Sequence, residues 1–262
     1  MRADKFLAER FGSRTKAAEA IEKGWVLVNG KKIRPKDEIK ESDIVSCLEI
    51  EQQYVSNGGY KLARALEAFH IPVKDGIFVD IGASTGGFTD CLLQNGAKKV
   101  FAVDVGSCLL HEKIALDDRV IIMDETNARY LKKDDFLDTI DAIVTDVSFI
   151  SLRLIFPVIN ELLNADGYAI TLIKPQFECE NKNIGKSGIV HLNAHREIVL
   201  KVTNYAKESG LVLCDITNAP IRKGKNIEYV ALWKKSGIGL KAYEITQKID
   251  ALINLYRAEM LH

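Results

Sequence analysis

The feature that most constrains this sequence is an alternation of short apolar segments with longer, more polar ones between residues 77 and 233. Each apolar segment is four to six residues long, which is typical of strands buried on both faces of a parallel sheet. These expected strands are residues 77–81, 100–103, 142–145, 168–173, 211–216 and 228–233. The alternation predicts an α/β domain with a doubly wound, Rossmann-like sheet.

Charged side chains mark the ends of the first four expected strands. Asp80 lies near the end of the first, and Asp104, Asp146 and Lys174 directly follow the next three. In sheets of this kind, ligands bind outside the carboxyl ends of the strands. We therefore expect these four side chains to line one site.

A glycine-rich turn, residues 82–87, follows the first expected strand. Its small residues allow the backbone to approach a ligand, but its glycine spacing differs from the GxGxxG pattern of dinucleotide sites. Asp80 before the turn would repel a pyrophosphate, whereas it suits the ammonium and sulfonium cations of S-adenosylmethionine. The loop favours S-adenosylmethionine over NAD or FAD. A turn that only packs a helix on a strand is the alternative.

Further along the chain, Asp104 is placed to accept hydrogen bonds from ribose hydroxyls, and Glu125 and Asn127 are placed to frame an adenine. The predicted cofactor-binding residues are Asp80, Gly82, Ser84, Thr85, Gly86, Gly87, Asp104, Glu125, Asn127 and Asp146.

The N-terminal segment has a different organisation and a basic charge. Residues 1–40 hold eleven Lys and Arg against six Asp and Glu, although the whole chain has 36 of each. We expect helices at residues 3–10 and 14–23, a hairpin at 26–33 around an Asn-Gly turn, and a strand at 44–50. This pattern resembles the small RNA-binding module of ribosomal protein S4, which implies docking on structured RNA. The predicted RNA-binding residues are Arg2, Arg14, Lys16, Lys31, Lys32 and Arg34.

Composition shifts predict the domain boundaries. We expect an S4-like domain at residues 1–52, a polar linker at 53–57, a catalytic domain at 58–236 and a C-terminal amphipathic helix within 237–262. The first helix of the catalytic domain is expected at residues 60–70, before Pro72.

Three continuous motifs are typical of a known protein family: Asp80-Ile-Gly-Ala-Ser-Thr-Gly-Gly-Phe-Thr-Asp90, Thr145-Asp-Val-Ser-Phe-Ile-Ser-Leu152 and Ile173-Lys-Pro-Gln-Phe-Glu178. They resemble the TlyA family, whose members carry the names haemolysin A and rRNA 2′-O-methyltransferase and whose catalytic domain is similar to the FtsJ/RrmJ methyltransferases. The resemblance implies methylation of a cytidine ribose in ribosomal RNA or ribosomal subunits, with S-adenosylmethionine as cofactor. It also implies a catalytic set of Lys61, Asp146, Lys174 and Glu228.

Two positions depart from the family pattern. Asn57 stands where members usually have Arg, which bears on a phosphate or substrate contact. Ser107-Cys108-Leu109-Leu110 replaces a usual Tyr and a later Gln-Leu, which bears on the ribose end of the cofactor.

The chemistry of the catalytic set leaves the role of Lys174 open. As a base near neutral pH it would need a lowered pKa, through burial or the charge of Lys61, and Asp146 and Glu228 oppose this. Positioning of the hydroxyl is the role we expect of all four residues, and two ordinary salt bridges are the alternative.

Other classes of protein fit the sequence less well. A non-catalytic RNA-binding assembly factor remains open, and a haemolysin is disfavoured because no segment reads as a membrane span or a signal peptide. The five cysteines are odd in number and include no CxxC pair, so we expect a reducing, cytoplasmic location. We also expect a monomer. His191 and His195 have no third ligand nearby, so no metal is expected.

Overall fold

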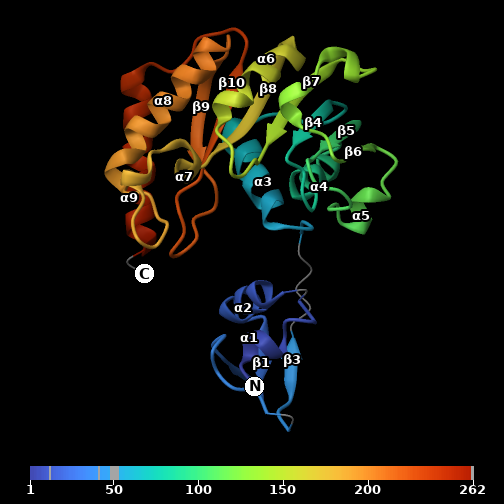
Figure 1. Cartoon of the computed structure of the whole chain (residues 1–262), viewed down its shortest axis with the longest axis vertical. Coiled ribbons are helices and arrows are strands. Elements are labelled where there is room, and N and C mark those ends of the chain that lie inside the picture. The colour runs from blue at the N-terminus through green and yellow to red at the C-terminus, as the bar shows by residue number, and fades with distance from the viewer. Residues whose placement is uncertain (12, 41, 48–52, 261–262) are drawn as a thin grey trace. The chain divides into compact units, whose positions relative to one another are not determined.

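The computed structural model describes residues 1–11, 13–40, 42–47 and 53–260 (Figure 1). The chain divides into two compact units, Met1–Gln53 and Tyr54–His262.

The first unit packs two helices on a three-stranded antiparallel sheet in the order β2-β1-β3. The elements are α1 (Ala3–Phe6), α2 (Arg14–Glu22), β1 (Val26–Val28), β2 (Lys31–Lys32) and β3 (Val45–Cys47). Asn29 and Gly30 join β1 to β2 with positive φ angles of 50° and 73°, as a tight hairpin turn requires.

Two expected elements of this unit differ in length. α1 ends at Phe6 rather than at residue 10, because the Ala8 amide bonds to a carbonyl three residues back and the chain continues as turns. The expected strand 44–50 is β3 over Val45–Cys47, and residues 48–50 lie outside the described part of the chain.

The second unit is built on a seven-stranded sheet in the order β6-β5-β4-β7-β8-β10-β9. The strands are β4 (Ile77–Ile81), β5 (Lys99–Val103), β6 (Val120–Met123), β7 (Ile140–Thr145), β8 (Leu163–Ile173), β9 (Val212–Asn218) and β10 (Tyr229–Lys234). All strands from β4 to β8 are parallel, and β10 is antiparallel to both of its neighbours. The predicted α/β, Rossmann-like fold is confirmed.

β8 begins at Leu163, earlier than the expected residue 168. Leu163 pairs with Ile140 of β7, and a register shift between Ile140 and Ala142 lets the pairing continue through the polar residues 164–167. The polar stretch hid this extension from the sequence pattern.

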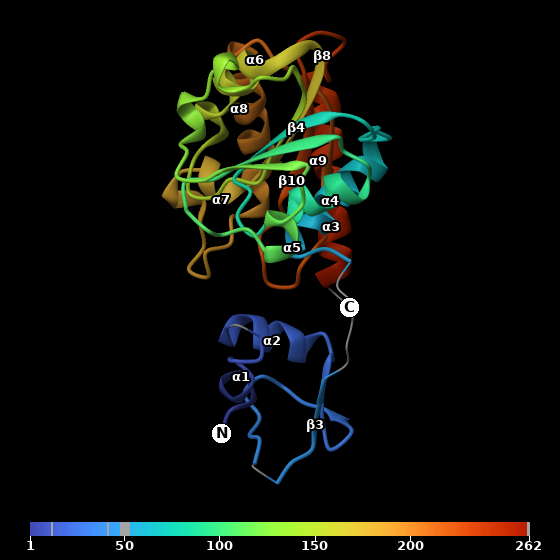
Figure 2. The same cartoon turned by 90° about the vertical axis from the view of Figure 1, so that its right-hand side faces the viewer.

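Helices cover both faces of the sheet. The helices of this unit are α3 (Asn57–Phe69), α4 (Gly87–Gln94), α5 (Glu112–Ala115), α6 (Phe156–Leu162), α7 (Pro175–Glu178), α8 (His195–Glu208) and α9 (Ala242–Met260). Short 3-10 turns lie at Ala128–Tyr130, Lys133–Asp135, Leu152–Leu154, Asn181–Asn183 and Leu192–Ala194. Side chains of α3, α4 and α5 share one core cluster with the sheet, and those of α6 and α8 share the other. Figure 2 shows the course of these helices around the sheet.

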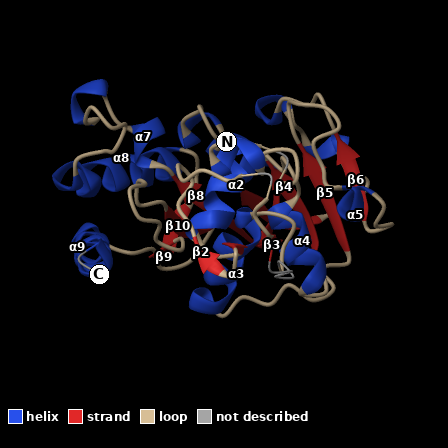
Figure 3. Ribbon diagram, turned by 90° about the horizontal axis from the view of Figure 1, so that it is seen from below, coloured by secondary structure: helices blue, strands red, loops and turns tan. Residues whose placement is uncertain are grey.

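The C-terminal helix α9 packs on the second unit itself. Its buried residues Ile245, Ile249, Ile253 and Tyr256 join the core cluster that contains α8 and β9. Figure 3 shows α9 beside the end of the sheet opposite to β6.

Residues 54–57, expected as part of a linker, pack against the second unit. Tyr54 is buried, the Val55 amide donates to Asp90 at 2.8 Å, and Ser56 caps α3, which therefore begins before the expected residue 60. Glycines permit this close approach: a Cβ on Gly59 would lie 2.2 Å from Cγ of Tyr54.

Candidate functional site

Four charged side chains from distant parts of the chain meet at the carboxyl edge of the sheet. Lys61 Nζ lies 3.0 Å from Asp146 Oδ2 and 2.7 Å from Glu228 Oε2. Lys174 Nζ lies 2.7 Å from Asp146 Oδ1 and donates to Ser148 Oγ at 2.8 Å. We call Lys61, Asp146, Lys174 and Glu228 the ion-pair cluster. The structure brings together all four residues of the predicted catalytic set.

Strand pairing explains three of these positions. Asp146 and Lys174 directly follow β7 and β8, which are parallel neighbours, so both side chains leave the same edge. Glu228 directly precedes β10, whose first residue Tyr229 pairs with Ile173 of β8. Lys61 comes from the first turns of α3, which packs on β10 through its buried face.

The cluster holds Lys61 as a cation. Burial lowers the pKa of this ammonium group, but the opposite charges of Asp146 and Glu228 outweigh burial and raise the pKa above its ordinary value. Lys61 is therefore a fixed positive charge rather than a proton acceptor near neutral pH.

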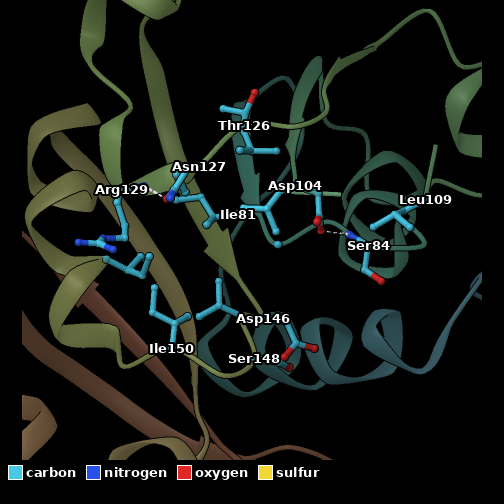
Figure 4. A pocket seen from close by; sticks show the side chains of 16 residues that line it. Ile81, Ser84, Asp104, Leu109, Thr126, Asn127, Arg129, Asp146, Ser148 and Ile150 are labelled. Carbon is cyan, nitrogen blue, oxygen red and sulfur yellow. Dashed lines mark hydrogen bonds between the residues drawn. The ribbon is translucent and has the colours of Figure 1, made fainter. Parts of the chain in front are cut away.

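A cavity of about 410 Å³ opens beside the cluster, and we call it the larger cavity (Figure 4). Ser84, Asp104, Asn127 and Asp146, all predicted cofactor residues, are among the side chains that line it. Apolar side chains complete much of its wall: Ile81, Val103, Val105, Leu109, Val147, Ile150 and Ile155. The combination suits a flat aromatic ring joined to a polar sugar.

Asp104 is fixed at this wall by the backbone. Its Oδ2 accepts a hydrogen bond from the Ser84 amide at 2.8 Å and its Oδ1 accepts one from the Gly106 amide at 2.9 Å (Figure 4). A carboxylate offers more lone pairs than these two bonds use, so Asp104 retains acceptor capacity for ligand hydroxyls.

A smaller cavity of about 190 Å³ adjoins the larger one. The two share Gly82, Ser84, Asp146 and Ser148, and the smaller cavity adds Thr85, Gly87 and Lys174 among its lining residues. The ion-pair cluster thus contributes Asp146 to both cavities and Lys174 to the smaller one.

Asp80 lies behind the cavities rather than in them. Its side chain is buried, and its Oδ2 accepts hydrogen bonds from the Thr89 amide at 3.0 Å and the Thr89 hydroxyl at 2.7 Å. Burial raises the pKa of this carboxyl to about 7. In this structure, Asp80 ties the glycine-rich turn to α4.

Two further predicted cofactor residues lie away from the cavity walls. Gly86 caps α4 with φ of 87°, where a Cβ would lie 3.0 Å from Leu110. The Glu125 side chain is exposed, and its amide donates to the Gly106 carbonyl at 3.0 Å. Neither residue is among the described residues that line the two cavities.

The sequence did not predict two of the lining residues, Thr126 and Arg129, which flank the predicted Asn127 along the same wall. Leu109, also in this wall, belongs to the segment whose departure from the family pattern bears on the ribose end of the cofactor. Phe149 is 91% exposed beside the cluster, has a positive φ of 63° and packs on Phe177 at 5.1 Å between ring centroids. The sequence placed Phe149 in the motif of residues 145–152 but gave no sign of its exposure.

Five of the six predicted RNA-binding residues lie on the surface of the first unit: Arg2, Arg14, Lys31, Lys32 and Arg34. Arg2 and Arg14 both pair with Asp4 and stay more than half exposed, and Arg34 pairs with Asp37. Lys31 and Lys32 are exposed on β2, and Lys16 lies in α2.

The fold and the site define the class of the protein as a methyltransferase. The family model for FtsJ-like methyltransferases matches residues 54–236, and the model for the S4 domain matches residues 1–45. The chain therefore belongs to the FtsJ-like methyltransferases and carries an S4 domain.

Relatives narrow the class to a family. The chain is 44% identical to Hemolysin A of Brachyspira hyodysenteriae over 84% of its length and 92% of that protein. It is 36% identical to the 16S/23S rRNA (cytidine-2′-O)-methyltransferase TlyA of Mycobacterium tuberculosis, over 86% and 85% respectively. A solved structure of a hemolysin-named protein from Streptococcus thermophilus is 35% identical, with a TM-score of 0.81 and coverage of 100% and 98%. The resemblance to the TlyA family is confirmed.

Within the described residues, no helix has the length and apolar character needed to cross a membrane. The same part of the chain contains no group of three or more His, Cys, Asp or Glu side chains that could hold a metal ion.

Proposed function

We propose that this protein transfers a methyl group from S-adenosylmethionine to the 2′-hydroxyl of a cytidine ribose in ribosomal RNA. The observation that carries the proposal is the ion-pair cluster at the junction of two cavities, in a chain of the TlyA family. The relatives' names supply the nucleotide and the class of RNA.

The residues of the site fit S-adenosylmethionine. Its adenine suits the apolar wall of the larger cavity, and its ribose hydroxyls suit the acceptor oxygens of Asp104. The smaller cavity, with the polar groups of Ser84 and Thr85, suits the amino acid end. When bound, the cofactor supplies a methyl group on a sulfonium, which needs no metal.

The cluster's own task is to hold and orient the target hydroxyl. Lys174 Nζ reaches the smaller cavity and is the atom that we assign to a hydrogen bond with that hydroxyl, because Asp146 and Ser148 fix its direction. Lys61 balances the two carboxylates and fixes Asp146 from the other side. Such positioning contributes several kcal/mol to lowering a barrier.

Label transfer tests the proposal. The protein is incubated with radiolabelled S-adenosylmethionine and ribosomal subunits from a strain that lacks it, and the RNA is then hydrolysed in alkali. A 2′-O-methyl group removes the hydroxyl that alkaline cleavage requires, so label is expected in alkali-resistant dinucleotides and is expected to disappear with Lys174→Ala. Label in mononucleotides would show base methylation and contradict the assignment.

Two other functions would give different experimental results. No label despite intact cofactor binding would favour a non-catalytic assembly factor. Leakage of liposomes caused by the purified protein would favour a lytic activity, which the name of the Brachyspira relative suggests for that protein.

A further inference from the structure

Two basic turns project from the second unit near the ion-pair cluster but outside it. The first spans residues 185–188, closed by a hydrogen bond from the Gly188 amide to the Gly185 carbonyl, and presents Lys186. The second spans residues 222–225, closed from the Lys225 amide to the Arg222 carbonyl, and presents Arg222, Lys223 and Lys225. All four basic side chains are exposed. Figures 1 and 2 both show these loops, in orange tones, extending past the sheet.

Both turns lie at the edge of the sheet that carries the site. The first belongs to the segment between β8 and α8, which begins with Lys174. The second connects β9 to β10. Because β8 and β9 are each antiparallel to β10, they run in the same direction, and the segments that follow them leave the same edge.

One side chain joins the two turns. Asn226 Oδ1 accepts a hydrogen bond from the Val190 amide at 2.8 Å, and Asn226 Nδ2 donates to the Gly188 carbonyl at 3.0 Å. Asn226 lies between the second basic turn and Glu228 of the ion-pair cluster. The basic turns are therefore held at a defined place relative to the catalytic set.

The second turn also has a rigid base. Ile227 is buried in the larger core cluster and Ile221 packs against it, so both ends of the turn are anchored. The Tyr256 hydroxyl of α9 donates to the Lys225 carbonyl at 2.9 Å. This contact gives the C-terminal helix, which extends beyond the matched family region, a role in supporting the turn.

Within the described residues, no Asp or Glu oxygen lies within 4.0 Å of the charged nitrogens of the four basic side chains in these turns. Exposed, unpaired cations on a fixed support favour contacts with the phosphates of a polyanion. We propose that the two turns form an RNA phosphate-contact surface on the catalytic unit, which holds the strand flanking the target nucleotide. This inference rests on the proposed function and adds to it a partner surface outside the S4 domain.

The variant Arg222→Ala/Lys223→Ala/Lys225→Ala tests this surface. Its dissociation constant for deproteinised 16S and 23S rRNA is measured over a series of KCl concentrations, together with steady-state kinetics on ribosomal subunits. We expect weaker RNA binding, with a log–log salt slope smaller by about 2 to 3, since each lost phosphate contact removes roughly one unit. KM for the subunits rises at least about tenfold in low-salt buffer, while kcat and the affinity for S-adenosylhomocysteine stay within twofold.

Two matched variants make the result specific. Lys98→Ala/Lys132→Ala/Lys133→Ala removes the same charge from exposed side chains on the segments that lead into β5 and β7, at the opposite edge of the sheet, and is expected to leave the KM unchanged. Arg222→Lys/Lys223→Arg/Lys225→Arg keeps the charge and is expected to bind RNA like the unaltered protein.

An unchanged KM and salt slope in the first variant, or an equal loss in the opposite-edge variant, would overturn the proposed surface. Failure of the proposed function looks different, because the unaltered protein would then transfer no label to ribosomal RNA. The comparison of RNA affinities among the variants would still decide whether the basic turns contact RNA.

Discussion

At the scale of single residues, Lys61 is a partly buried ammonium group between two carboxylates, with 15% of its side chain exposed. Asp146 and Glu228 keep it charged. Among the ion pairs of the described residues, only those of Lys61 link Glu228 to the rest of the ion-pair cluster. Removing it would leave two carboxylates close together without a compensating charge at this point.

Lys61→Met is therefore expected to reduce kcat by about 100-fold or more, in the range of a lost positioning or acid–base group. The affinity for S-adenosylhomocysteine is expected to stay within about threefold of that of the unaltered protein, because Lys61 is not one of the described residues that line the larger cavity. Single-turnover label transfer and calorimetry measure the two effects. An equal loss of cofactor affinity would show instead that Lys61 supports the binding site.

Asp80 gives a prediction about pH and stability. The pKa of this buried carboxyl is raised to about 7, so the folded state favours its protonated form. In the unfolded chain, this carboxyl ionises near pH 4. The raised pKa therefore lowers the free energy of unfolding. This destabilisation is absent below about pH 4, grows as pH rises and is complete above about pH 7.

Asp80→Asn removes this titration. Relative to the unaltered protein, the variant is expected to gain stability as pH rises from 4 to 7, by up to roughly 4 kcal/mol. Urea denaturation at pH 5 and pH 8 measures the difference in the free energy of unfolding. A difference that does not change with pH would mean that Asp80 is ionised throughout in the folded protein.

At the scale of elements, the crossing of α3 and α4 decides where Lys61 lies. Ser56, Gly58 and Gly59 approach α4 so closely that a Cβ on Gly87 would lie 2.1 Å from Ser56 Oγ and 2.9 Å from the Gly59 nitrogen. Absence of side chains at this crossing lets α3 place Lys61 over the sheet edge.

Two adjacent glycines of α3 give a matched test of how closely Tyr54 packs on this helix. A Cβ on Gly59 would lie 2.2 Å from the Tyr54 ring, whereas one on Gly58 would make an ordinary contact at 3.4 Å. Gly59→Ala is expected to destabilise the protein by about 1–3 kcal/mol through overpacking. Gly58→Ala is expected to be neutral or to stabilise α3 by up to about 1 kcal/mol, because alanine favours helix. Chemical denaturation compares the two variants, and similar results for both would contradict the close packing of Tyr54 on α3.

At the scale of the whole molecule, the RNA contacts that we propose are divided between two units. The S4 domain carries exposed basic residues on α2 and β2, and the catalytic unit carries the cluster and the basic turns. Under the proposed function, we expect the exposed basic residues to supply affinity by charge and the ion-pair cluster to decide which atom reacts.

Lys31→Ala/Lys32→Ala/Arg34→Ala is expected to raise KM for ribosomal subunits and lower the salt dependence of RNA binding, with kcat preserved at saturating subunits. Steady-state label transfer at several KCl concentrations checks this. Loss of kcat with unchanged KM would mean that the S4 domain acts on the chemical step instead.

The sequence by itself determined the local parts of this protein. Apolar segments with a polar end predict strands such as Ile77–Ile81, and the Asn29-Gly30 pair predicts a hairpin turn, because strand and turn preferences depend on neighbouring residues. The motifs around Asp80, Asp146 and Lys174 indicated the family and the catalytic set, since each motif is continuous in the chain.

Only the tertiary structure decided which of these residues meet. Lys61 and Asp146 are 85 residues apart, and their contact depends on how α3 packs against the sheet. Asp80 proved to be buried beneath its loop and Glu125 to be exposed away from the cavities, because burial depends on elements that pack from elsewhere in the chain. The link that Asn226 makes between two basic turns is of the same kind: long-range pairing creates it, and no local pattern encodes it.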